Sequence, residues 1–244
     1  MLAQYLLSAL VTGAVASPVE KAHQRRQNVP VGSIINSCTV AGTVAVAFDD
    51  GPYIYTEQIL DALADSGIKA TFFVNGMNWA SIYDYSSTVQ RMVNEGHQVA
   101  SHTWSHPDLT TLTTDDVTWQ MTQLESALVD IVGSFPTYMR PPYFSTNDAV
   151  LQTMADLGYH VIQADIDTQD WANDSPDAIQ NSVQLFNQDL DAGGSIVLAH
   201  DVHAETANTL VPAMIAAIQD RGLQGVTVGE CLGDSQDNWY RTSR

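Results

Sequence analysis

The chain has 244 residues, a formal net charge of −19 and 45% apolar residues. This length suits one α/β domain with a substantial core. The large acidic excess argues against nucleic acid and anionic membranes as partners, and beyond the N-terminus no apolar run reaches the length of a membrane span. We therefore expect a globular monomer that binds neither nucleic acid nor membrane.

The N-terminus has the pattern of a secretory leader. Residues 2–15 are mostly apolar, and Ala14-Val15-Ala16 resembles a signal-peptidase site. The segment lacks an initial Lys or Arg, so a buried N-terminal helix is the alternative. Arg25-Arg26 in the polar stretch that follows is typical of pro-peptide cleavage. We predict a signal peptide over residues 1–16, a pro-peptide over 17–26, and secretion to the extracellular space or cell wall.

Two further features fit a secretory compartment. The only cysteines are Cys38 and Cys231, near opposite ends of the mature chain. In an oxidising compartment they are expected to form a disulfide; two unpaired buried thiols are the alternative. The sequon Asn173-Asp174-Ser175 is a candidate glycosylation site, although Pro176 follows it.

Strand and helix patterns alternate after Cys38. Short apolar runs predict strands at Thr43–Phe48, Ala70–Val74, His97–Ser101, Thr137–Arg140, Tyr159–Ala164, Ser195–Ala199 and Gly225–Val228. Helical spacing and caps predict helices at Tyr55–Ser66, Val89–Glu95, Thr113–Val132, Asn147–Leu157, Pro176–Leu190 and Glu205–Arg221, the last with a kink or late start at Pro212. The alternation predicts an α/β fold with a mostly parallel sheet in a single domain over residues 38–233, followed by a C-terminal tail over 234–244.

Polar side chains gather where the predicted strands end. They are Asp49 and Asp50 after the first strand, His102 and His106 after the third, Arg140 after the fourth, Asp165, Asp167 and Asp170 after the fifth, and His200 after the sixth. A doubly wound sheet and a barrel both place function at the carboxyl ends of strands. One rim must bring five strands together here, so we favour a closed or nearly closed barrel.

A divalent metal site is the chemistry these residues favour. On one helical turn His102 and His106 would face the same way, and Asp50 would complete a set of two imidazoles and one carboxylate. A pair of surface histidines is the alternative for the imidazoles. Asp49 is left as a base that could accept a proton, or as a capping carboxylate. Neighbouring strand residues normally point to opposite faces, but the following Gly51-Pro52 relaxes that rule.

Two other segments supply groups around this site. In Arg140-Pro141-Pro142-Tyr143 the guanidinium could hold Asp49 charged, and the Tyr143 N–H suits an oxyanion; a rigid surface turn is the alternative. His200 near Asp167 or Asp170 could be held protonated as a general acid, or be structural. Trp171 and Leu198 could wall a small apolar pocket.

These segments together resemble a known family. Phe48-Asp49-Asp50-Gly51-Pro52, His102-Thr103-Trp104-Ser105-His106, Arg140-Pro141-Pro142-Tyr143, Asp167-Thr168-Gln169-Asp170-Trp171 and Leu198-Ala199-His200 resemble, in order, the five motifs of the polysaccharide deacetylases of carbohydrate esterase family 4, the NodB homology domain. The likeness spans residues 43–228 and is greatest to secreted fungal chitin deacetylases. Ala47 stands where the family often has Thr.

The resemblance implies a distorted (β/α) barrel of about seven parallel strands and metal-dependent hydrolysis of N-acetyl groups from N-acetylglucosamine in chitin or chitooligosaccharides. It assigns the metal to Asp50, His102 and His106, with zinc the expected ion and cobalt an alternative. It makes Asp49 the base, steadied by Arg140, and His200 the acid, tuned by Asp170. It places the Tyr143 N–H at the oxyanion and Trp171 and Leu198 at the acetyl methyl.

Other functions remain open from the sequence. Acetylxylan or peptidoglycan could be the substrate within the family. A glycoside hydrolase with two rim carboxylates would have no use for the two histidines. A non-catalytic sugar-binding protein on the same scaffold would lack one of the catalytic groups, and none is missing. Exposed aromatics at Trp79, Tyr83, Tyr85 and Trp104 could line a glycan groove or simply pack.

Overall fold

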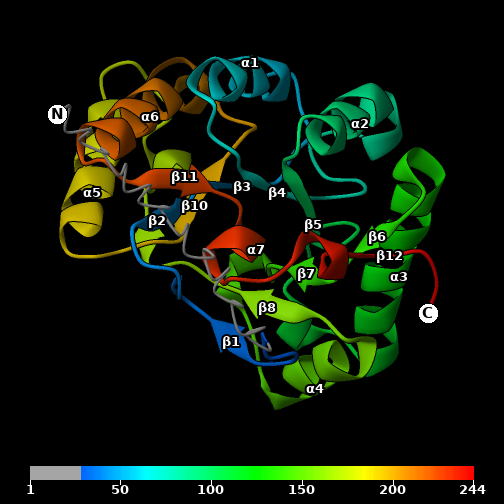
Figure 1. Cartoon of the computed structure of the whole chain (residues 1–244). Helices are drawn as coiled ribbons and strands as arrows, with labels where there is room; N and C mark the ends of the chain where they lie inside the picture. Colours follow the sequence, from blue (N-terminus) through cyan, green and yellow to red (C-terminus); the bar gives the residue numbers. More distant parts are fainter. Residues whose placement is uncertain (1–28) are drawn as a thin grey trace, which may run out of the picture.

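A curled sheet of eight parallel strands lies at the centre of the protein, in a computed structural model that describes residues 29–244 (Figure 1). The predicted signal peptide and pro-peptide lie outside the described residues. In spatial order the strands are β1 (Ile34–Ile35), β8 (His160–Ile162), β7 (Tyr138–Met139), β5 (Gln98–Ser101), β4 (Thr71–Val74), β3 (Ala47–Asp49), β10 (Val197–His200) and β9 (Ile166–Asp167). The predicted distorted (β/α) barrel is confirmed, but as an open half-barrel rather than the closed or nearly closed barrel favoured from the sequence, because the first and last strands do not pair.

The first predicted strand divides in two. β2 (Thr43–Ala45) pairs in parallel with β11 (Gln224–Val226) in a small separate sheet, and β3 enters the main sheet after Val46. The seventh predicted strand therefore lies outside the barrel. The main sheet instead gains β1 and β9, which are too short to show a periodic pattern in the sequence.

Helices cover the outside of the sheet (Figure 1). They are α1 (Thr56–Ser66), α2 (Ser86–Asn94), α3 (Thr114–Val132), α4 (Asp148–Leu157), α5 (Ile179–Asp191) and α6 (Val211–Asp220), with a short α7 (Val228–Cys231) near the C-terminus. α3 begins where the Thr113 hydroxyl accepts the Asp116 N–H at 3.2 Å. The kink or late start predicted at Pro212 takes the form of an irregular helix: a π-helical turn over Thr206–Leu210 runs directly into α6, and the proline lies in the first turn of α6.

Apolar side chains fill both faces of the sheet. Along β4, Phe72 packs in the larger cluster beneath the helices, while Phe73 packs in a second cluster with Tyr138 inside the curl. This follows from the alternation of side chains in a strand. Burying a phenyl ring contributes roughly 2–3 kcal/mol, so these strands are held from both sides. A rigid sheet results, and its carboxyl edge can hold polar groups in fixed positions.

The two ends of the described chain are tied to the domain. A disulfide joins Cys38 to Cys231, across 193 positions of sequence, as predicted. Residues 234–244, expected to be a tail, pack on the domain: Trp239 is buried, and β12 (Tyr240–Arg241) pairs antiparallel with β6 (Phe135–Pro136). The Arg244 guanidinium also forms an ion pair with the buried Glu125.

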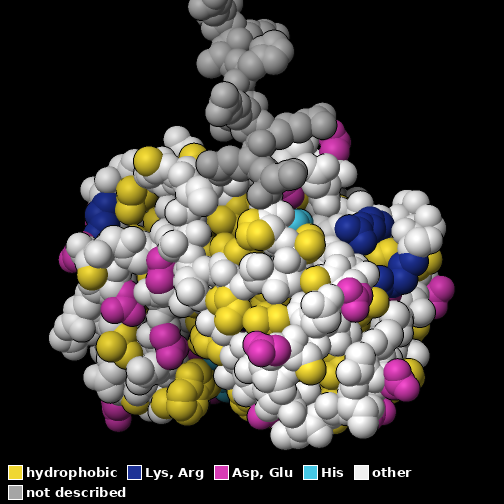
Figure 2. All heavy atoms as spheres, turned by 90° about the horizontal axis from the view of Figure 1, so that it is seen from below, with side chains coloured by type: hydrophobic (Ala, Val, Ile, Leu, Met, Phe, Trp, Pro, Cys, Tyr) yellow, Lys and Arg dark blue, Asp and Glu magenta, His cyan; other side chains and the backbone are white. Residues whose placement is uncertain are grey.

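Within residues 29–244, no helix combines the length and apolar character needed to cross a bilayer. Figure 2 shows one face of the molecule, on which Asp and Glu are dispersed and Lys and Arg are confined to small groups near the margins. This face therefore has no broad basic surface.

Candidate active site

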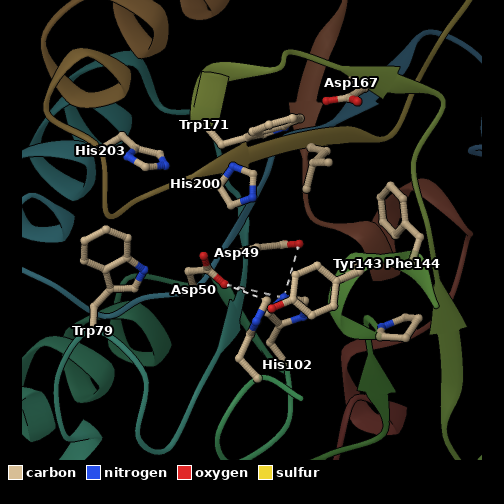
Figure 3. A pocket seen from close by; sticks show the side chains of 13 residues that line it. Asp49, Asp50, Trp79, His102, Tyr143, Phe144, Asp167, Trp171, His200 and His203 are labelled. Carbon is tan, nitrogen blue, oxygen red and sulfur yellow. Dashed lines mark ion pairs between the residues drawn. The ribbon is translucent and has the colours of Figure 1, made fainter. Parts of the chain in front are cut away.

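Three side chains converge after β3 and β5 in an arrangement suited to a divalent ion. The Asp50 Oδ1 atom lies 3.2 Å from His106 Nε2 and 3.6 Å from His102 Nε2. The three ligand atoms all lie within 4.8 Å of one another (Figure 3). The structure thus brings together the predicted metal ligands.

The local backbone explains why two adjacent aspartates reach the same site. Asp50 has a φ of 79°, in the left-handed region that most residues avoid. This turn replaces the strand alternation that would send Asp49 and Asp50 to opposite faces. Such strain is found at functional sites, where the surrounding structure maintains it.

The two histidines meet for a different reason from the one predicted. Residues 102–106 form an irregular loop rather than a helical turn, with positive φ at Thr103 and His106. Asn75 maintains the loop by donating its side-chain amide to the carbonyl oxygens of His102 and Thr103. The helical spacing was therefore the wrong explanation for a correct pair.

The donor atoms are prepared to bind a cation. The His102 Nδ1 atom lies 2.7 Å from the Arg140 carbonyl oxygen, so Nδ1 carries the proton and the Nε2 lone pair faces the site. Burial lowers the pKa of His102 to about 3, which keeps the ring neutral. Asp50 Oδ1 is buried and has no hydrogen-bond partner among the described residues. A buried carboxylate oxygen without a partner is costly, and a cation would satisfy it. These residues therefore fit a divalent metal.

Asp49 lies beside this triad and is held by a buried ion pair. Its Oδ1 accepts a hydrogen bond of 2.8 Å from Arg140 Nη1, and both side chains are almost fully buried. Arg140 also donates to two backbone carbonyls, and its guanidinium lies 4.3 Å over the Phe73 ring. The other oxygen, Oδ2, lies 3.7 Å from His102 Nε2 and so faces the metal donors. Burial raises the pKa of Asp49, and the Arg140 charge opposes that rise.

His200 forms a second charged pair, with Asp170. In Figure 3, His200 and His102 lie on opposite sides of Asp49. The His200 Nδ1 atom lies 2.7 Å from Asp170 Oδ1, while the His200 backbone N–H and the Thr206 hydroxyl each donate to Asp170 Oδ2 at 2.7 Å. Burial lowers the pKa of His200, but the Asp170 charge and hydrogen bond outweigh it and raise the pKa to about 9. Asp167 instead accepts the Gln169 N–H at 3.0 Å. The structure thus pairs His200 with Asp170, the partner that the family resemblance implied, and not with Asp167.

These groups face a cavity of about 550 Å³, within the range typical of small-ligand sites. It is lined by Asp49, Asp50, Trp79, His102, His106, Pro141, Tyr143, Phe144, Asp167, Trp171, Leu198, His200 and His203 (Figure 3). Tyr143 has a φ of 57° and its ring centroid lies 4.7 Å from that of His106. The predicted Tyr143, Trp171 and Leu198 therefore all line the cavity.

Of the four rim aromatics named from the sequence, only Trp79 lines this cavity. Tyr83 donates its hydroxyl to Asp130 at 3.3 Å, Tyr85 packs on Tyr53, and Trp104 packs half-buried against the main core. Tyr83 and Tyr85 lie in a short 3-10 turn after β4 that contacts α2 and α3, and Trp104 lies in the loop after β5. The sequence pattern does not specify how these two segments pack.

Asp201 was not predicted. It is 1% exposed and accepts the Thr56 hydroxyl at 2.6 Å. A Cβ built on Gly51 would lie 2.1 Å from an Asp201 oxygen, so only glycine allows this approach. Burial, joined by the nearby Asp50 and Asp49 charges, raises the pKa of Asp201 to about 7. Asp201 thereby links the strand that bears His200 to the loop that bears Asp50. The feature of the sequence that could have identified Asp201 is its position directly after His200.

His203 was also missed, although its spacing of three from His200 was visible in the sequence. It lines the cavity beside Trp79, and the two ring centroids are 5.9 Å apart.

Comparison with known proteins agrees with this geometry. A family model described as polysaccharide deacetylase matches residues 36–162. A chitin deacetylase from a Pestalotiopsis species is 54% identical over 242 residues, covering 99% of this chain and 80% of the relative. The structure of the chitin deacetylase from the fungal pathogen Colletotrichum lindemuthianum superposes with a TM-score of 0.86 at 45% identity, covering 88% of this chain and 98% of that one.

A peptidoglycan N-acetylglucosamine deacetylase from Bacillus cereus is more distant, at 32% identity over 198 residues, covering 80% of this chain and 70% of the relative. The matched family region contains the metal-ligand triad, Asp49, Arg140 and Tyr143, and the relatives extend the likeness over His200 and Asp170. The chain belongs to the polysaccharide deacetylase family.

Proposed function

We propose that this protein hydrolyses the N-acetyl groups of N-acetylglucosamine units in chitin or chitooligosaccharides, releasing acetate. The observation that carries the proposal is the Asp50, His102 and His106 triad, which has a buried carboxylate oxygen without a partner and is flanked by the Asp49 and His200 pairs. The relatives named chitin deacetylase support the choice of substrate.

We propose zinc as the ion held by Asp50, His102 and His106, with cobalt as a substitute. When bound, such an ion supplies Lewis acidity that activates water and polarises the acetamide carbonyl. The neutral His102 ring and its bond to the Arg140 carbonyl keep one donor aligned without the ion.

Asp49 is the proposed general base. Arg140 occupies its Oδ1, so Oδ2 is left on the side of the metal donors to accept a proton from the attacking water. The water oxygen forms a bond to the acetyl carbon, and the carbonyl oxygen gains negative charge. The Tyr143 backbone N–H is proposed to stabilise that charge.

His200 is the proposed general acid. As the bond between the acetyl carbon and nitrogen breaks, protonated His200 donates a proton to the leaving amine. Asp170 favours this protonated form and fixes the ring through Nδ1. The products are acetate and a free amino sugar. Trp171 and Leu198 are proposed to contact the acetyl methyl.

The proposal also covers the localisation, processing and glycosylation of the protein. We propose residues 1–16 as a signal peptide, 17–26 as a pro-peptide, and secretion as a monomer to the extracellular space or cell wall; the disulfide agrees with an oxidising compartment. The Asn173 amide donates to Gln169 O and Ser182 Oγ, both at 3.1 Å, and a glycan on Asn173 would remove one of these two donors.

The test is acetate release from defined chitin oligomers, with mass spectrometry of the products. We expect loss of acetyl groups at constant chain length, loss of activity on chelation, and recovery with zinc. An Asp49→Asn variant with normal turnover would contradict the role of Asp49. Chain shortening would indicate a glycoside hydrolase instead.

Peptidoglycan and acetylxylan measured in parallel test the alternatives within the family. A higher kcat/KM on peptidoglycan would assign the activity of the Bacillus cereus relative.

A further inference from the structure

The loop that carries the Tyr143 N–H has a locally unfavourable backbone. Tyr143 has a φ of 57° and Phe144 a φ of 53°, so two successive residues with side chains occupy the left-handed region. The Phe144 N–H donates to the Pro141 carbonyl at 3.0 Å, and the Ser145 N–H closes a similar turn, also at 3.0 Å. Left-handed conformations of this kind persist only where the surrounding structure holds them.

The conformation of this loop sets the direction of the Tyr143 N–H. Pro141 and Pro142 carry no N–H, so Tyr143 supplies the first backbone donor of the loop after Arg140. In Figure 3 the Tyr143 and Phe144 rings lie together on one side of the cavity, which both residues line. Whatever fixes the loop therefore also fixes the donor that faces the cavity.

Gln163 holds the loop from outside. It directly follows β8, and its side-chain Nε2 donates to the Phe144 carbonyl oxygen at 3.1 Å. The bond fixes the peptide plane that follows the two left-handed residues. Because the partners are 19 positions apart in the sequence, the loop cannot supply this support by itself.

The backbone of Gln163 is anchored independently of its side chain. Its N–H donates to the Ile35 carbonyl at 2.8 Å, and its own carbonyl accepts Arg140 Nη2 at 3.0 Å. Arg140 in turn holds Asp49 through Nη1. Gln163 thus contacts both the cation that orients the proposed base and the loop that carries the proposed oxyanion donor. A substitution of its side chain removes only the second of these contacts.

We propose that Gln163 is a positioning residue for deacetylation, which holds residues 141–144 in the conformation that directs the Tyr143 N–H toward the oxyanion. The inference rests on the proposed function and extends it to a residue outside the five segments that carry the family resemblance. Without the Gln163 amide the two left-handed residues relax and the Tyr143 N–H moves away. A displaced donor stabilises the transition state less and affects binding of the uncharged substrate little, so the loss falls on kcat.

The experiment compares two variants of Gln163 in the zinc-loaded protein. Gln163→Ala removes the amide, and Gln163→Met keeps a side chain of similar length that has no donor. Both are expected to lower kcat for acetate release from chitotetraose about 5- to 50-fold, less than the roughly 100- to 1,000-fold cost of removing an oxyanion donor outright. KM should stay within about 2-fold of its value in the unchanged protein. Expressing kcat per bound zinc removes any contribution from unfolded protein.

Gln90 offers a matched control. Its Nε2 donates to the Ile131 carbonyl at 2.9 Å, and it lies on α2, apart from the residues that line the cavity. Gln90→Ala should keep the kcat and KM of the unchanged protein. The inference is overturned if Gln163→Met keeps full kcat, if the loss in either Gln163 variant appears in KM instead of kcat, or if Gln90→Ala loses as much kcat as Gln163→Ala.

Hydrogen exchange separates failure of this inference from failure of the proposed function. Backbone exchange is measured for the peptide that contains Phe144 and Ser145, whose N–H groups are bonded within the loop. It should be faster in Gln163→Ala than in the unchanged protein, and unaffected in Gln90→Ala. Faster exchange supports the hold of Gln163 on the loop even if the unchanged protein releases no acetate, a result that would reject only the proposed function. Equal exchange in all three proteins would reject the role of Gln163.

Discussion

Replacing Asp170 by Asn tests the assignment of His200 as the acid. The substitution removes a buried negative charge 2.7 Å from His200 Nδ1 while keeping a side chain of similar shape. In the unchanged protein burial lowers the pKa of His200, but the Asp170 charge outweighs it and the pKa is about 9. Without that charge burial is the largest remaining effect and the smaller contributions of the Asp49 and Asp50 charges oppose it, so the pKa should fall toward the ordinary value of about 6.5.

The size of the effect follows from the protonated fraction. At pH 8 a group of pKa about 9 is roughly 90% protonated, whereas a group of pKa about 6.5 is roughly 3% protonated. Asp170→Asn should therefore lose about 30-fold or more of its turnover at pH 8, and much less at pH 5, where both proteins hold the proton. The assay is the pH profile of kcat for acetate release from chitin oligomers, at saturating zinc.

The same pair predicts a pH dependence of stability. The pKa of His200 is raised by folding, so its contribution is fully present below about pH 6.5 and is lost as pH rises through about 9. A shift of this size corresponds to up to about 3 kcal/mol of unfolding free energy, and the slope should disappear in Asp170→Asn. Asp177→Asn, in an exposed position of the next loop, is the control. Two results would refute the reasoning. In the pH profile of kcat, the alkaline limb of Asp170→Asn could stay where it is in the unchanged protein, or Asp170→Asn could lose the same fraction of kcat at every pH.

The remaining predictions concern the metal, its support and the covalent structure. Asp50→Ala should abolish stoichiometric zinc binding, measured by calorimetry; retained binding would place the ion elsewhere. Asp201→Ala should weaken zinc binding about 10-fold by loosening the Asp50 loop, with recovery of activity at high zinc and partial rescue by Asp201→Asn; an unchanged Kd would limit Asp201 to packing. Replacing Cys38 and Cys231 together by Ser should lower the unfolding free energy by at most about 5 kcal/mol in denaturant titration, and no change would contradict cross-linking by this disulfide. Intact mass before and after enzymatic removal of N-glycans measures occupancy of Asn173, and we expect any occupied fraction to unfold at lower temperature because one of the two hydrogen bonds donated by the Asn173 amide is lost.

Much of the site could be predicted from local sequence. Apolar runs ending in Asp49, His102, Arg140 and His200 indicated strands of one sheet, and parallel strands present their carboxyl ends at one edge. The chemistry of the side chains then favoured a metal, a base and an acid. The pairing of His200 with Asp170 rather than Asp167 remained open, because both lie in one short loop.

Tertiary structure decided how these side chains meet. The left-handed turn at Asp50 and the irregular loop from His102 to His106 exist because distant groups, such as the Asn75 amide, hold them. No local spacing predicts a conformation that is locally unfavourable and stabilised elsewhere. The strands β1 and β9, which border the open edge of the half-barrel, were also not predicted. They are too short to leave a pattern in the sequence.

The amino-acid sequence by itself determined which chemical groups lie at the rim, because hydrophobic patterning fixes where each strand ends. Which of these groups are in contact was decided only by the curl of the sheet. The curl places the Trp79 ring beside the His203 ring and the Asp201 carboxylate beside Gly51. The physical reason is range: burial patterns act over a few residues, whereas contacts between loops depend on the packing of the whole barrel.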